Sequence, residues 1–347
     1  MRACYALVVP GLEQLAAHEL TATGAIAGDT LAGFDRRDSI VLFQTADLAR
    51  VLRCGLLEDA FLTLADLPTP RARNVPAVLA RTLTREALDA ALLDHHALLA
   101  KRRGRSYRVV VRVAGRQPFR REQVEAAFGR ALASLLPHWV RARESAAAVE
   151  VWVHVAGGRT VVGLRVSSDE LAQRRYKRAH LPASLKPTVA RALVLWSAPQ
   201  PADVVLDPLA GAGTVLRERA EAGRAALIAG GDIDPAAVAA ARTNTGRQAA
   251  LALWDTTRLP MRPGSVDALI TNPPYGRQHG APDGIEGLYR GLLREAARVL
   301  RPGGRCVVLT GEPAVLARAV PAALRVRARH RLLVRGLAVT AFIMERR

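Results

Sequence analysis

The sequence predicts an α/β protein whose C-terminal half is a doubly wound, mostly parallel sheet. Two observations support this fold class. Between residues 203 and 311, short apolar strand patterns alternate with helical patterns, as in a parallel sheet covered by helices. The tail 324–346 instead shows two longer strand patterns around Arg335 and Gly336, so we expect an antiparallel hairpin at the edge of that sheet.

Local signals place the elements of this C-terminal half. Pro235 opens one helix, because proline fits the first helical turn, and Gly223 ends another. The tight turn RPGG precedes the last of the parallel strands. The expected strands are 203–208, 225–232, 249–255, 266–272 and 305–311, and the expected helices are 213–223, 235–245 and 287–300.

The first 60 residues predict a separate, smaller α/β unit. Its order is β-α-β-α, with Pro10 near the start of the first helix and Gly24 at its end. The expected strands are 4–9 and 39–45, and the expected helices are 10–24 and 47–55.

Residues 61–167 continue the alternation, and 168–187 read as a linker. Two strand patterns around Gly157 and Gly158 predict a hairpin. The segment RRYKRAHLPASLKP (174–187) combines charge, two prolines and little periodicity, which is typical of a linker or hinge. The other expected elements are helices 85–101 and 121–137, strand 106–114, and the hairpin strands 148–156 and 160–167.

The chain is strongly basic, with 50 Lys and Arg against 31 Asp and Glu and a net charge of +19. Because only three of the basic residues are lysines, arginine-rich codon usage is an alternative source of this charge. Codon usage would spread the charge evenly, whereas residues 71–180 alone sum to +13. We therefore predict a nucleic-acid partner. The expected RNA-binding residues lie in two clusters and are Arg102, Arg103, Arg105, Arg174, Arg175, Lys177 and Arg178.

Other classes of protein are not indicated. Cys4, Cys54 and Cys306 are far apart and lack CxxC spacing, so neither a disulfide framework nor a zinc site is predicted. The histidines show no metal-ligand spacing, and we expect no metal. No apolar run reaches the roughly 18 residues of a membrane span, and no signal-peptide pattern is present. We therefore expect a cytoplasmic protein.

The segment DPLAGAGT (207–214) follows the first strand of the C-terminal half, where open parallel sheets bind ligands. Gly211 and Gly213 allow a tight turn and a close approach of the backbone to a ligand. The helix that begins near Thr214 directs its free N–H groups to the same place. Leu216 replaces the third glycine of the dinucleotide fingerprint and no GK[ST] follows, so no pyrophosphate loop is predicted.

Two acidic residues follow the next two strands. Asp232, in GGDID (230–234), can accept hydrogen bonds from both hydroxyls of a ribose. Asp255 ends the third strand and can accept a hydrogen bond from the exocyclic amine of an adenine. Alternatively, Asp234 caps the helix opened by Pro235, and Asp255 belongs to a turn. Together with the glycine loop, the acids favour an adenosine-containing ligand without a pyrophosphate.

D-P-x-x-G-x-G-T after the first strand, combined with N-P-P-Y (272–275) after the fourth, resembles the S-adenosylmethionine-dependent amino methyltransferases. The resemblance covers about residues 187–347 and implies a Rossmann-like class I methyltransferase sheet with S-adenosylmethionine as cofactor. It also implies that Asp207 faces the methionine amino end, and it departs from many relatives in having Ala210 instead of Cys. The expected cofactor-binding residues are Asp207, Pro208, Ala210, Gly211, Gly213, Thr214, Asp232, Ile233, Asp255, Thr256 and Asn272.

N-P-P-Y also suits the chemistry of amine methylation. An exocyclic base amine is a weak nucleophile because its lone pair is delocalised into the ring. The side-chain carbonyl of Asn272 and the backbone carbonyl of Pro273 can bind both amine hydrogens and turn the lone pair outwards, if Pro273 and Pro274 keep the loop rigid. Tyr275 can stack on an extruded base. The expected catalytic residues are therefore Asn272, Pro273 and Tyr275, and positioning in line with an activated methyl supplies much of the rate without a metal.

The N-terminal half is similar to that of the THUMP-domain tRNA guanine-N2 methyltransferases, in VVPGLEQLAAHEL (8–20), in the hairpin strands and in the linker. This resemblance implies ferredoxin-like, THUMP, linker and methyltransferase segments at 1–60, 61–167, 168–187 and 188–347. In that family the first two domains hold the tRNA acceptor end, and the catalytic domain methylates N2 of a guanosine in the acceptor stem. Asn272, where relatives acting elsewhere in tRNA often have Asp, favours the position-six branch. We expect tRNA as partner and a monomer.

Two alternatives remain open from the residues. N-P-P-Y serves adenine N6 as well as guanine N2, so the substrate could be ribosomal RNA or DNA adenine. A non-catalytic RNA-binding protein with a decayed methyltransferase fold is the other alternative. The intact set of acids, glycines and Asn272 argues against decay.

Overall fold

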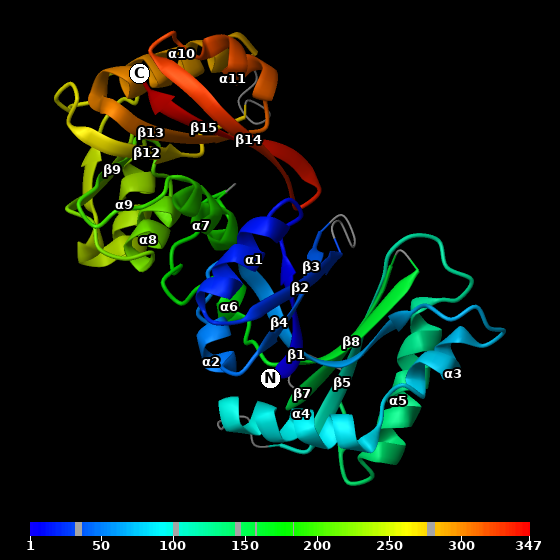
Figure 1. The fold of residues 1–347 in the computed structure, drawn as a ribbon. Helices are drawn as coiled ribbons and strands as arrows, with labels where there is room; N and C mark the ends of the chain where they lie inside the picture. Colours follow the sequence, from blue (N-terminus) through cyan, green and yellow to red (C-terminus); the bar gives the residue numbers. More distant parts are fainter. Residues whose placement is uncertain (32–36, 100–103, 143–146, 157, 183, 276–281) are drawn as a thin grey trace. The chain divides into compact units, whose positions relative to one another are not determined.

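The computed structural model contains two compact units, Met1–Leu171 and Ala172–Arg347 (Figure 1). It describes the whole chain except residues 32–36, 100–103, 143–146, 157, 183 and 276–281. No helix in the described part of the chain is long and apolar enough to cross a membrane.

The first unit is built on one mixed sheet of eight strands in the order β2-β3-β1-β4-β8-β7-β5-β6. Its helices are α1 (Glu13–Ala22), α2 (Leu48–Val51), α3 (Val75–Ala80), α4 (Arg85–Leu98) and α5 (Arg121–Leu135), and α6 (Glu170–Gln173) contains the point in the chain where the second unit begins. The strands are β1 (Arg2–Val8), β2 (Ile26–Leu31), β3 (Ser39–Thr45), β4 (Leu57–Pro68), β5 (Ser106–Val113), β6 (Val140–Arg141), β7 (Val149–Ala156) and β8 (Arg159–Arg165).

Strands β2 and β4 correct the order expected for the N-terminal region. The expected β-α-β-α order of residues 1–60 was wrong, because β2 adds a strand between α1 and β3. Its sequence IAGDTL contains Gly and Asp, which are rare in strands, so these residues did not predict a strand. β4 spans the proposed domain boundary at residues 60 and 61 and pairs with β1 on one side and β8 on the other. The strands of the proposed ferredoxin-like and THUMP segments therefore share one sheet, and their division stays a prediction.

The second unit has the predicted sheet. Its order is β11-β10-β9-β12-β13-β15-β14, in which the first five strands are parallel and β15 and β14 form the antiparallel hairpin. The strand order reverses between β9 and β12, which is the topological switch point where such sheets bind ligands. The strands are β9 (Val204–Asp207), β10 (Leu227–Asp232), β11 (Ala250–Leu253), β12 (Val266–Thr271), β13 (Leu300–Thr310), β14 (Leu324–Val334) and β15 (Leu337–Arg346).

Helices cover both faces of this sheet. α7, α8 and α9 lie on one face, and α10 and α11 lie on the other (Figure 1). α7 begins at Pro187, where proline occupies the first helical turn. α11 and α7 had no counterpart among the expected helices, and α10 begins before the expected residue 287. The helices are α7 (Pro187–Trp196), α8 (Thr214–Glu221), α9 (Pro235–Thr245), α10 (Pro282–Val299) and α11 (Pro313–Ala319), with a 3-10 turn η1 (Gly246–Gln248).

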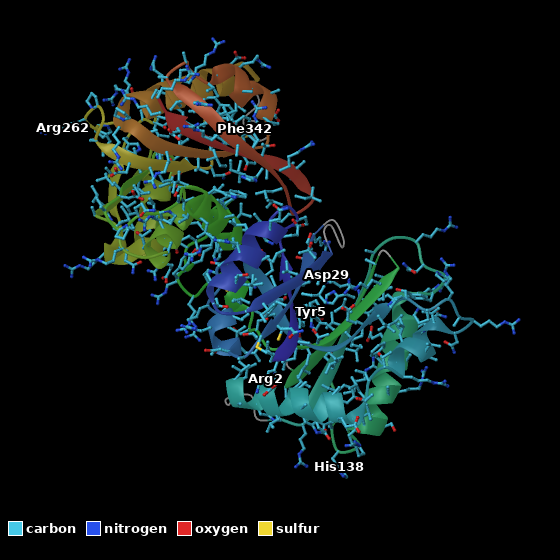
Figure 2. The ribbon with its side chains drawn as sticks, viewed as in Figure 1. Arg2, Tyr5, Asp29, His138, Arg262 and Phe342 are labelled. Carbon is cyan, nitrogen blue, oxygen red and sulfur yellow. The ribbon has the colours of Figure 1, made fainter. Side chains whose placement is uncertain are left out.

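The core of the second unit fixes β12, β13 and the hairpin against α10. Tyr289 and Leu293 of α10 pack in one buried cluster with Val308 of β13 and with Phe342 and Met344 of β15. Phe342 is labelled in Figure 2 and is fully buried. Because the hairpin shares this core, its orientation relative to the carboxyl ends of the parallel strands is fixed.

Candidate active site

The carboxyl ends of β9 and β12 meet at one buried carboxylate. Asp207, the last residue of β9, is 2% exposed, and its Oδ1 accepts the N–H of Leu209 at 3.2 Å. Burial raises the pKa of Asp207 to about 7, although the Thr271 hydroxyl of β12 and the Leu209 N–H favour the ionised form and oppose the rise. A cationic group placed beside this carboxylate would favour its ionised form further. The structure thus puts a potential counter-ion for an ammonium group at the switch point.

The glycine loop adopts the backbone that its sequence requires. Gly211 and Gly213 have φ of 49° and 75°, the left-handed region that glycine enters without strain. A Cβ on Gly213 would also lie 3.1 Å from the Cα of Ala241 in α9. The Gly211 N–H donates to Oδ2 of Asp232 at 3.0 Å, which joins the loop to the end of β10. Two of the expected cofactor-binding segments are therefore in direct contact.

The structure also supports the alternative roles of Asp234 as a helix cap and of Asp255 as part of a turn. Asp234 caps α9 by accepting the Ala236 N–H at 2.8 Å. Asp255 is exposed and accepts both the N–H and the hydroxyl of Thr257 at 2.8 Å, and these hydrogen bonds lower its pKa. A turn role for Asp255 leaves its second oxygen for a ligand.

The remaining cofactor candidates differ in burial. Ala210, Thr214 and Thr256 are buried, whereas Ile233 is 68% exposed next to Asp232. The carbonyl of Pro208 accepts a hydrogen bond from Trp254 Nε1 at 3.1 Å, which ties the glycine loop to the end of β11. The ends of β9, β10 and β11 thus form one edge, as the sequence predicted. Contact of these residues with a cofactor remains a prediction.

The N-P-P-Y loop begins at the end of β12 and is held on two sides. The hydroxyl of Tyr289 in α10 donates a hydrogen bond to the carbonyl of Pro274 at 3.1 Å. The Tyr275 ring lies so close to Gly311 that a Cβ there would be 2.9 Å from Cδ2 of the ring. The Tyr275 hydroxyl donates to Oδ1 of Asn272 at 2.5 Å. The acceptor expected to hold a base amine is therefore occupied by a tyrosine hydroxyl.

Asn244 of α9 is a site residue that sequence reasoning missed. It is 3% exposed and makes four hydrogen bonds. Its Oδ1 accepts the N–H groups of Arg178 and Ala179, each at 2.9 Å. Its Nδ2 donates to the carbonyls of Ala179 at 2.9 Å and of Ala212, inside the glycine loop, at 2.8 Å. The signal was an asparagine inside a helix, where this residue type is disfavoured unless its amide is used.

The four basic linker candidates fall into two groups. Arg175 and Arg178 are exposed. Arg174 donates to Glu218 at 3.1 Å, and Lys177 Nζ donates to the carbonyl of Leu185 at 2.5 Å. Burial, together with the charge of Arg335, lowers the pKa of Lys177 to about 8. Arg174 and Lys177 thus hold the linker against its own unit, and an RNA contact stays a prediction for all four cations.

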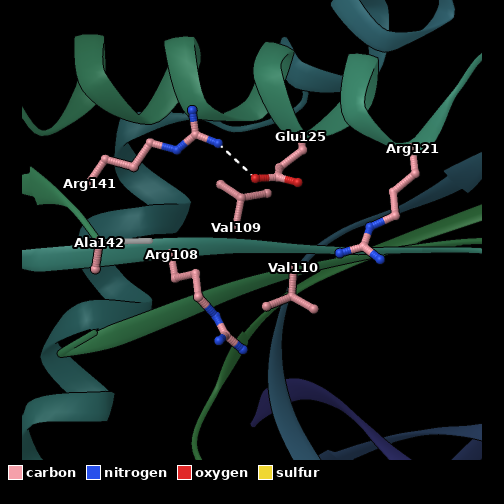
Figure 3. A pocket seen from close by; sticks show the side chains of 7 residues that line it. All are labelled: Arg108, Val109, Val110, Arg121, Glu125, Arg141 and Ala142. Carbon is pink, nitrogen blue, oxygen red and sulfur yellow. Dashed lines mark hydrogen bonds and ion pairs between the residues drawn. The ribbon is translucent and has the colours of Figure 1, made fainter. Parts of the chain in front are cut away.

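The first unit contains a basic pocket of about 620 Å³ on β5, α5 and β6 (Figure 3). Three arginines line it, and the sequence prediction contained none of them. Arg108 pairs with Glu150 at 3.1 Å, and Arg141 pairs with Glu125 at 2.9 Å. Arg121 begins α5 at the other side of the pocket. Among the predicted cations of this unit, Arg105 is exposed just before β5, and Arg102 and Arg103 lie outside the described residues.

No cluster of three or more His, Cys, Asp or Glu within the described ranges could hold a metal ion. The second unit combines a parallel sheet, closed by an antiparallel hairpin, with a glycine loop, acids and an N-P-P-Y loop at the carboxyl edge. This combination defines a class I amino methyltransferase.

Comparisons with known proteins identify the family. The model of the RMKL-like methyltransferase domain matches residues 174–339. A tRNA (guanine(6)-N2)-methyltransferase of Thermus thermophilus is 34% identical over 251 residues, which cover 70% of this chain and 72% of that enzyme. The bovine tRNA (guanine(6)-N(2))-methyltransferase THUMP3 is 33% identical over 189 residues, covering 50% of this chain and 37% of its own. The crystal structure of TrmN from Thermus thermophilus superposes with a TM-score of 0.83 at 29% identity over the whole of both chains.

The chain belongs to the family of THUMP-type tRNA guanine-N2 methyltransferases. It is an enzyme, and its methyl donor is S-adenosylmethionine.

Proposed function

We propose that this enzyme methylates the N2 amine of the guanosine at position six in the acceptor stem of tRNA. The observation that carries the proposal is the pairing of β9 with β12, which brings the buried carboxylate of Asp207 and Asn272, the residue after β12, to one edge of the sheet. An amine acceptor and an ammonium acceptor thus lie at one switch point. The Thermus and bovine relatives, named as guanine(6)-N2 methyltransferases, support tRNA and this position.

The chain's own residues fit the cofactor. Asp207 binds the methionine ammonium, and the left-handed backbone at Gly211 and Gly213 lets the cofactor approach the loop without meeting a Cβ. Asp232 accepts hydrogen bonds from the ribose hydroxyls. Asp255 and Thr256 bind the adenine, and the exposed side chain of Ile233, next to Asp232, makes apolar contact with its ring.

The base amine is held by the N-P-P-Y loop. Oδ1 of Asn272 and the carbonyl of Pro273 accept its two hydrogens, and the Tyr275 ring stacks on the base after the hydroxyl leaves Asn272. The carbonyl of Pro274 is already engaged by Tyr289, so it does not compete for the amine. The loop orients the nitrogen lone pair towards the methyl group.

The transfer is a displacement at carbon. A bond forms between N2 and the methyl carbon while the bond from that carbon to sulfur breaks, and its electron pair stays on sulfur to give S-adenosylhomocysteine. The positively charged nitrogen then loses one proton to solvent. Alignment of nitrogen, carbon and sulfur is the main catalytic contribution, because the sulfonium methyl is already activated.

The first unit binds the acceptor end of the tRNA. The pocket lined by Arg108, Arg121 and Arg141 places three guanidinium groups around one cavity, where a phosphate would compete with Glu150 for Arg108 and with Glu125 for Arg141 (Figure 3). Exposed Arg105 lies just before β5, which carries Arg108. Binding through phosphates positions the RNA but does not select the base, which the N-P-P-Y loop must do. We propose a monomer as the active species.

The test uses purified full-length protein, labelled S-adenosylmethionine and tRNA from cells that lack this activity, followed by nucleoside mass spectrometry. N2-methylguanosine is expected, and a tRNA with adenosine at position six should not be labelled. Label in that variant would overturn position six, and N6-methyladenosine would overturn the choice of base. Calorimetry with S-adenosylmethionine that shows no heat of binding would indicate a decayed fold.

A further inference from the structure

The β14–β15 hairpin extends past the carboxyl edge of the parallel strands (Figure 1). The last residue of β13 that pairs with β15 is Thr310, opposite Thr340. β14 and β15 continue for three more residue pairs, up to Val334 opposite Leu337. At about 3.4 Å per residue, this paired part projects about 10 Å beyond β13, and the turn adds to it. The projection occurs at the edge that carries the N-P-P-Y loop.

Arg331 lies on the same face and at the same level as that loop. It is opposite Thr340, and Thr340 is opposite Thr310, so the three side chains point to one face of the sheet. On this face the Thr310 hydroxyl bonds to Tyr289 at 2.9 Å, and Tyr289 holds the carbonyl of Pro274. Two strand spacings, about 10 Å, separate Arg331 from Thr310. The exposed guanidinium of Arg331 is therefore close to the loop that receives the base.

The turn of the hairpin presents a second arginine. Arg335 and Gly336 have φ of 51° and 82°, so both central residues of the turn are left-handed. Asn or Gly is preferred at such a position, and an arginine there adopts an uncommon backbone conformation. Arg335 is exposed, and its charge helps to lower the pKa of Lys177 in the linker. The turn thus holds an exposed arginine in a left-handed conformation at the end of the projecting hairpin, where an anion can reach it.

Two other arginines of β14 interact within the sheet. Arg327 donates two hydrogen bonds of 2.9 Å to Glu345, and the guanidinium of Arg329 lies 4.8 Å from the centre of the Phe342 ring. Arg331 and Arg335 have no ion pair or hydrogen bond through their guanidinium groups with any residue that the structure describes. Arg331 and Arg335 therefore differ from Arg327 and Arg329 of β14, whose guanidinium groups contact Glu345 and Phe342.

We propose that the tip of the β14–β15 hairpin is a phosphate-binding element, in which Arg331 and Arg335 contact the RNA backbone beside the base that enters the site. This rests on the proposed function and deepens it, because it assigns an RNA contact to the catalytic unit. A polyanion at the tip also offsets the repulsion between Arg335 and Lys177. Charged residues on an edge strand discourage aggregation as well, but that role applies equally to both ends of β14.

The experiment compares two double variants of the full-length enzyme that lose the same charge. The tip variant is Arg331→Gln with Arg335→Asn, because Asn tolerates the left-handed turn. The control is Arg325→Gln with Arg327→Gln at the opposite end of the same strand. The tRNA dissociation constant is measured by filter binding over a series of salt concentrations, and S-adenosylmethionine affinity by calorimetry.

For the tip variant, we expect the dissociation constant to rise about tenfold and the salt slope to fall by about 1–2, because each lost phosphate contact removes close to one unit. In the control variant, the dissociation constant and the salt slope should change little. The single variant Arg335→Lys keeps the charge and should retain most of the tRNA binding. Equal effects of the two double variants would overturn the proposal, as would a matching loss of cofactor affinity in the tip variant. If the wild type fails to methylate tRNA but the tip variant still loses RNA affinity, the proposed function fails and the hairpin site stands.

Discussion

The hydroxyl of Tyr275 donates a 2.5 Å hydrogen bond to the side-chain carbonyl of Asn272, the same oxygen that the proposed chemistry assigns to the base amine. The Tyr275 ring meanwhile lies against Gly311. Burial raises the pKa of Tyr275 well above its ordinary value, so the phenol is protonated and donates throughout the neutral range. The tyrosine thus satisfies one lone pair of this acceptor in the absence of substrate, and in the proposed reaction its hydroxyl leaves when the ring turns to stack on the base.

Two variants can separate the hydrogen bond of the Tyr275 hydroxyl from the stacking of its ring. Tyr275→Phe keeps the ring but removes the competing donor, so kcat should change by less than about threefold and the KM for tRNA should not rise. Tyr275→Ala removes the stacking surface, which is worth about 1–3 kcal/mol, so the KM should rise by roughly 5- to 150-fold. Steady-state kinetics with purified tRNA distinguishes them. A Phe variant as impaired as the Ala variant would show that the hydroxyl itself is needed for transfer.

Asn272→Ala should abolish methyl transfer, because the amine loses the acceptor that orients its lone pair. S-adenosylmethionine affinity should stay within about threefold, since the glycine loop and the acids remain in place. Calorimetry and single-turnover transfer measure the two quantities separately. Retained transfer in this variant would show that Asn272 does not orient the amine.

The pH dependence of cofactor binding should report on Asp207. Its pKa in the free enzyme is raised to about 7 by burial, and pairing with the methionine ammonium requires the ionised carboxylate. Affinity for S-adenosylmethionine should therefore increase as the pH rises towards 7 and level off above it, with a limiting slope of about tenfold per pH unit. Asp207→Asn should bind more weakly and without this slope. A flat profile in the wild type would exclude the pairing.

The same shift predicts the sign of a stability effect. Because the folded-state pKa of Asp207 lies above its ordinary value of 3.8, the folded protein holds a proton that the unfolded chain loses between about pH 4 and 7. The contribution of Asp207 to the free energy of unfolding therefore falls as the pH rises through this window. Asp207→Asn should remove that contribution, as measured by denaturant unfolding at several pH values, compared with Asp232→Asn as a control.

Asn244 should act as a positioning residue between the linker and the glycine loop. Asn244→Asp keeps an acceptor for the Arg178 and Ala179 N–H groups but can no longer donate to the carbonyls of Ala179 and Ala212. We expect weaker cofactor binding by roughly tenfold with a smaller change in kcat, because losing a buried hydrogen bond costs about 1–3 kcal/mol. The measurement is the KM for each substrate and kcat. Thr243→Ala, at the neighbouring exposed position of α9, is the control, and an equal effect there would argue against positioning.

The arginines of the basic linker should contribute unequally to RNA binding. Arg175→Ala with Arg178→Ala removes two charges that face solvent and should lower the salt slope of tRNA binding by about 1–2. Arg174→Ala breaks the pair with Glu218, which is 2% exposed, and should reduce the free energy of unfolding more than the tRNA affinity. Unchanged salt slopes in the first variant would exclude phosphate contacts from this segment.

The sequence by itself determined the class of the catalytic unit, because its evidence is local. Asp207 and Asp232 end strands, the glycine loop and Asn272 follow strands, and each of these strands is recognisable from its own residues. Parallel strands bring such ends to one edge. The antiparallel hairpin was also predictable, since its two strand patterns flank Arg335 and Gly336. Local periodicity and turn chemistry are enough for these inferences.

Only the tertiary structure decided which side chains bond to which. Asn244 joins residues 65 and 32 positions away, and nothing in its neighbourhood specifies those partners. The hydroxyl of Tyr289 reaches Pro274 because α10 packs on β12 and β13, and β4 pairs with two strands that are distant in the chain. Lys177 Nζ donates to the carbonyl of Leu185, a partner that its own charged segment did not indicate. Such contacts depend on burial and on long-range pairing, which leave no periodic signal in the residues that make them.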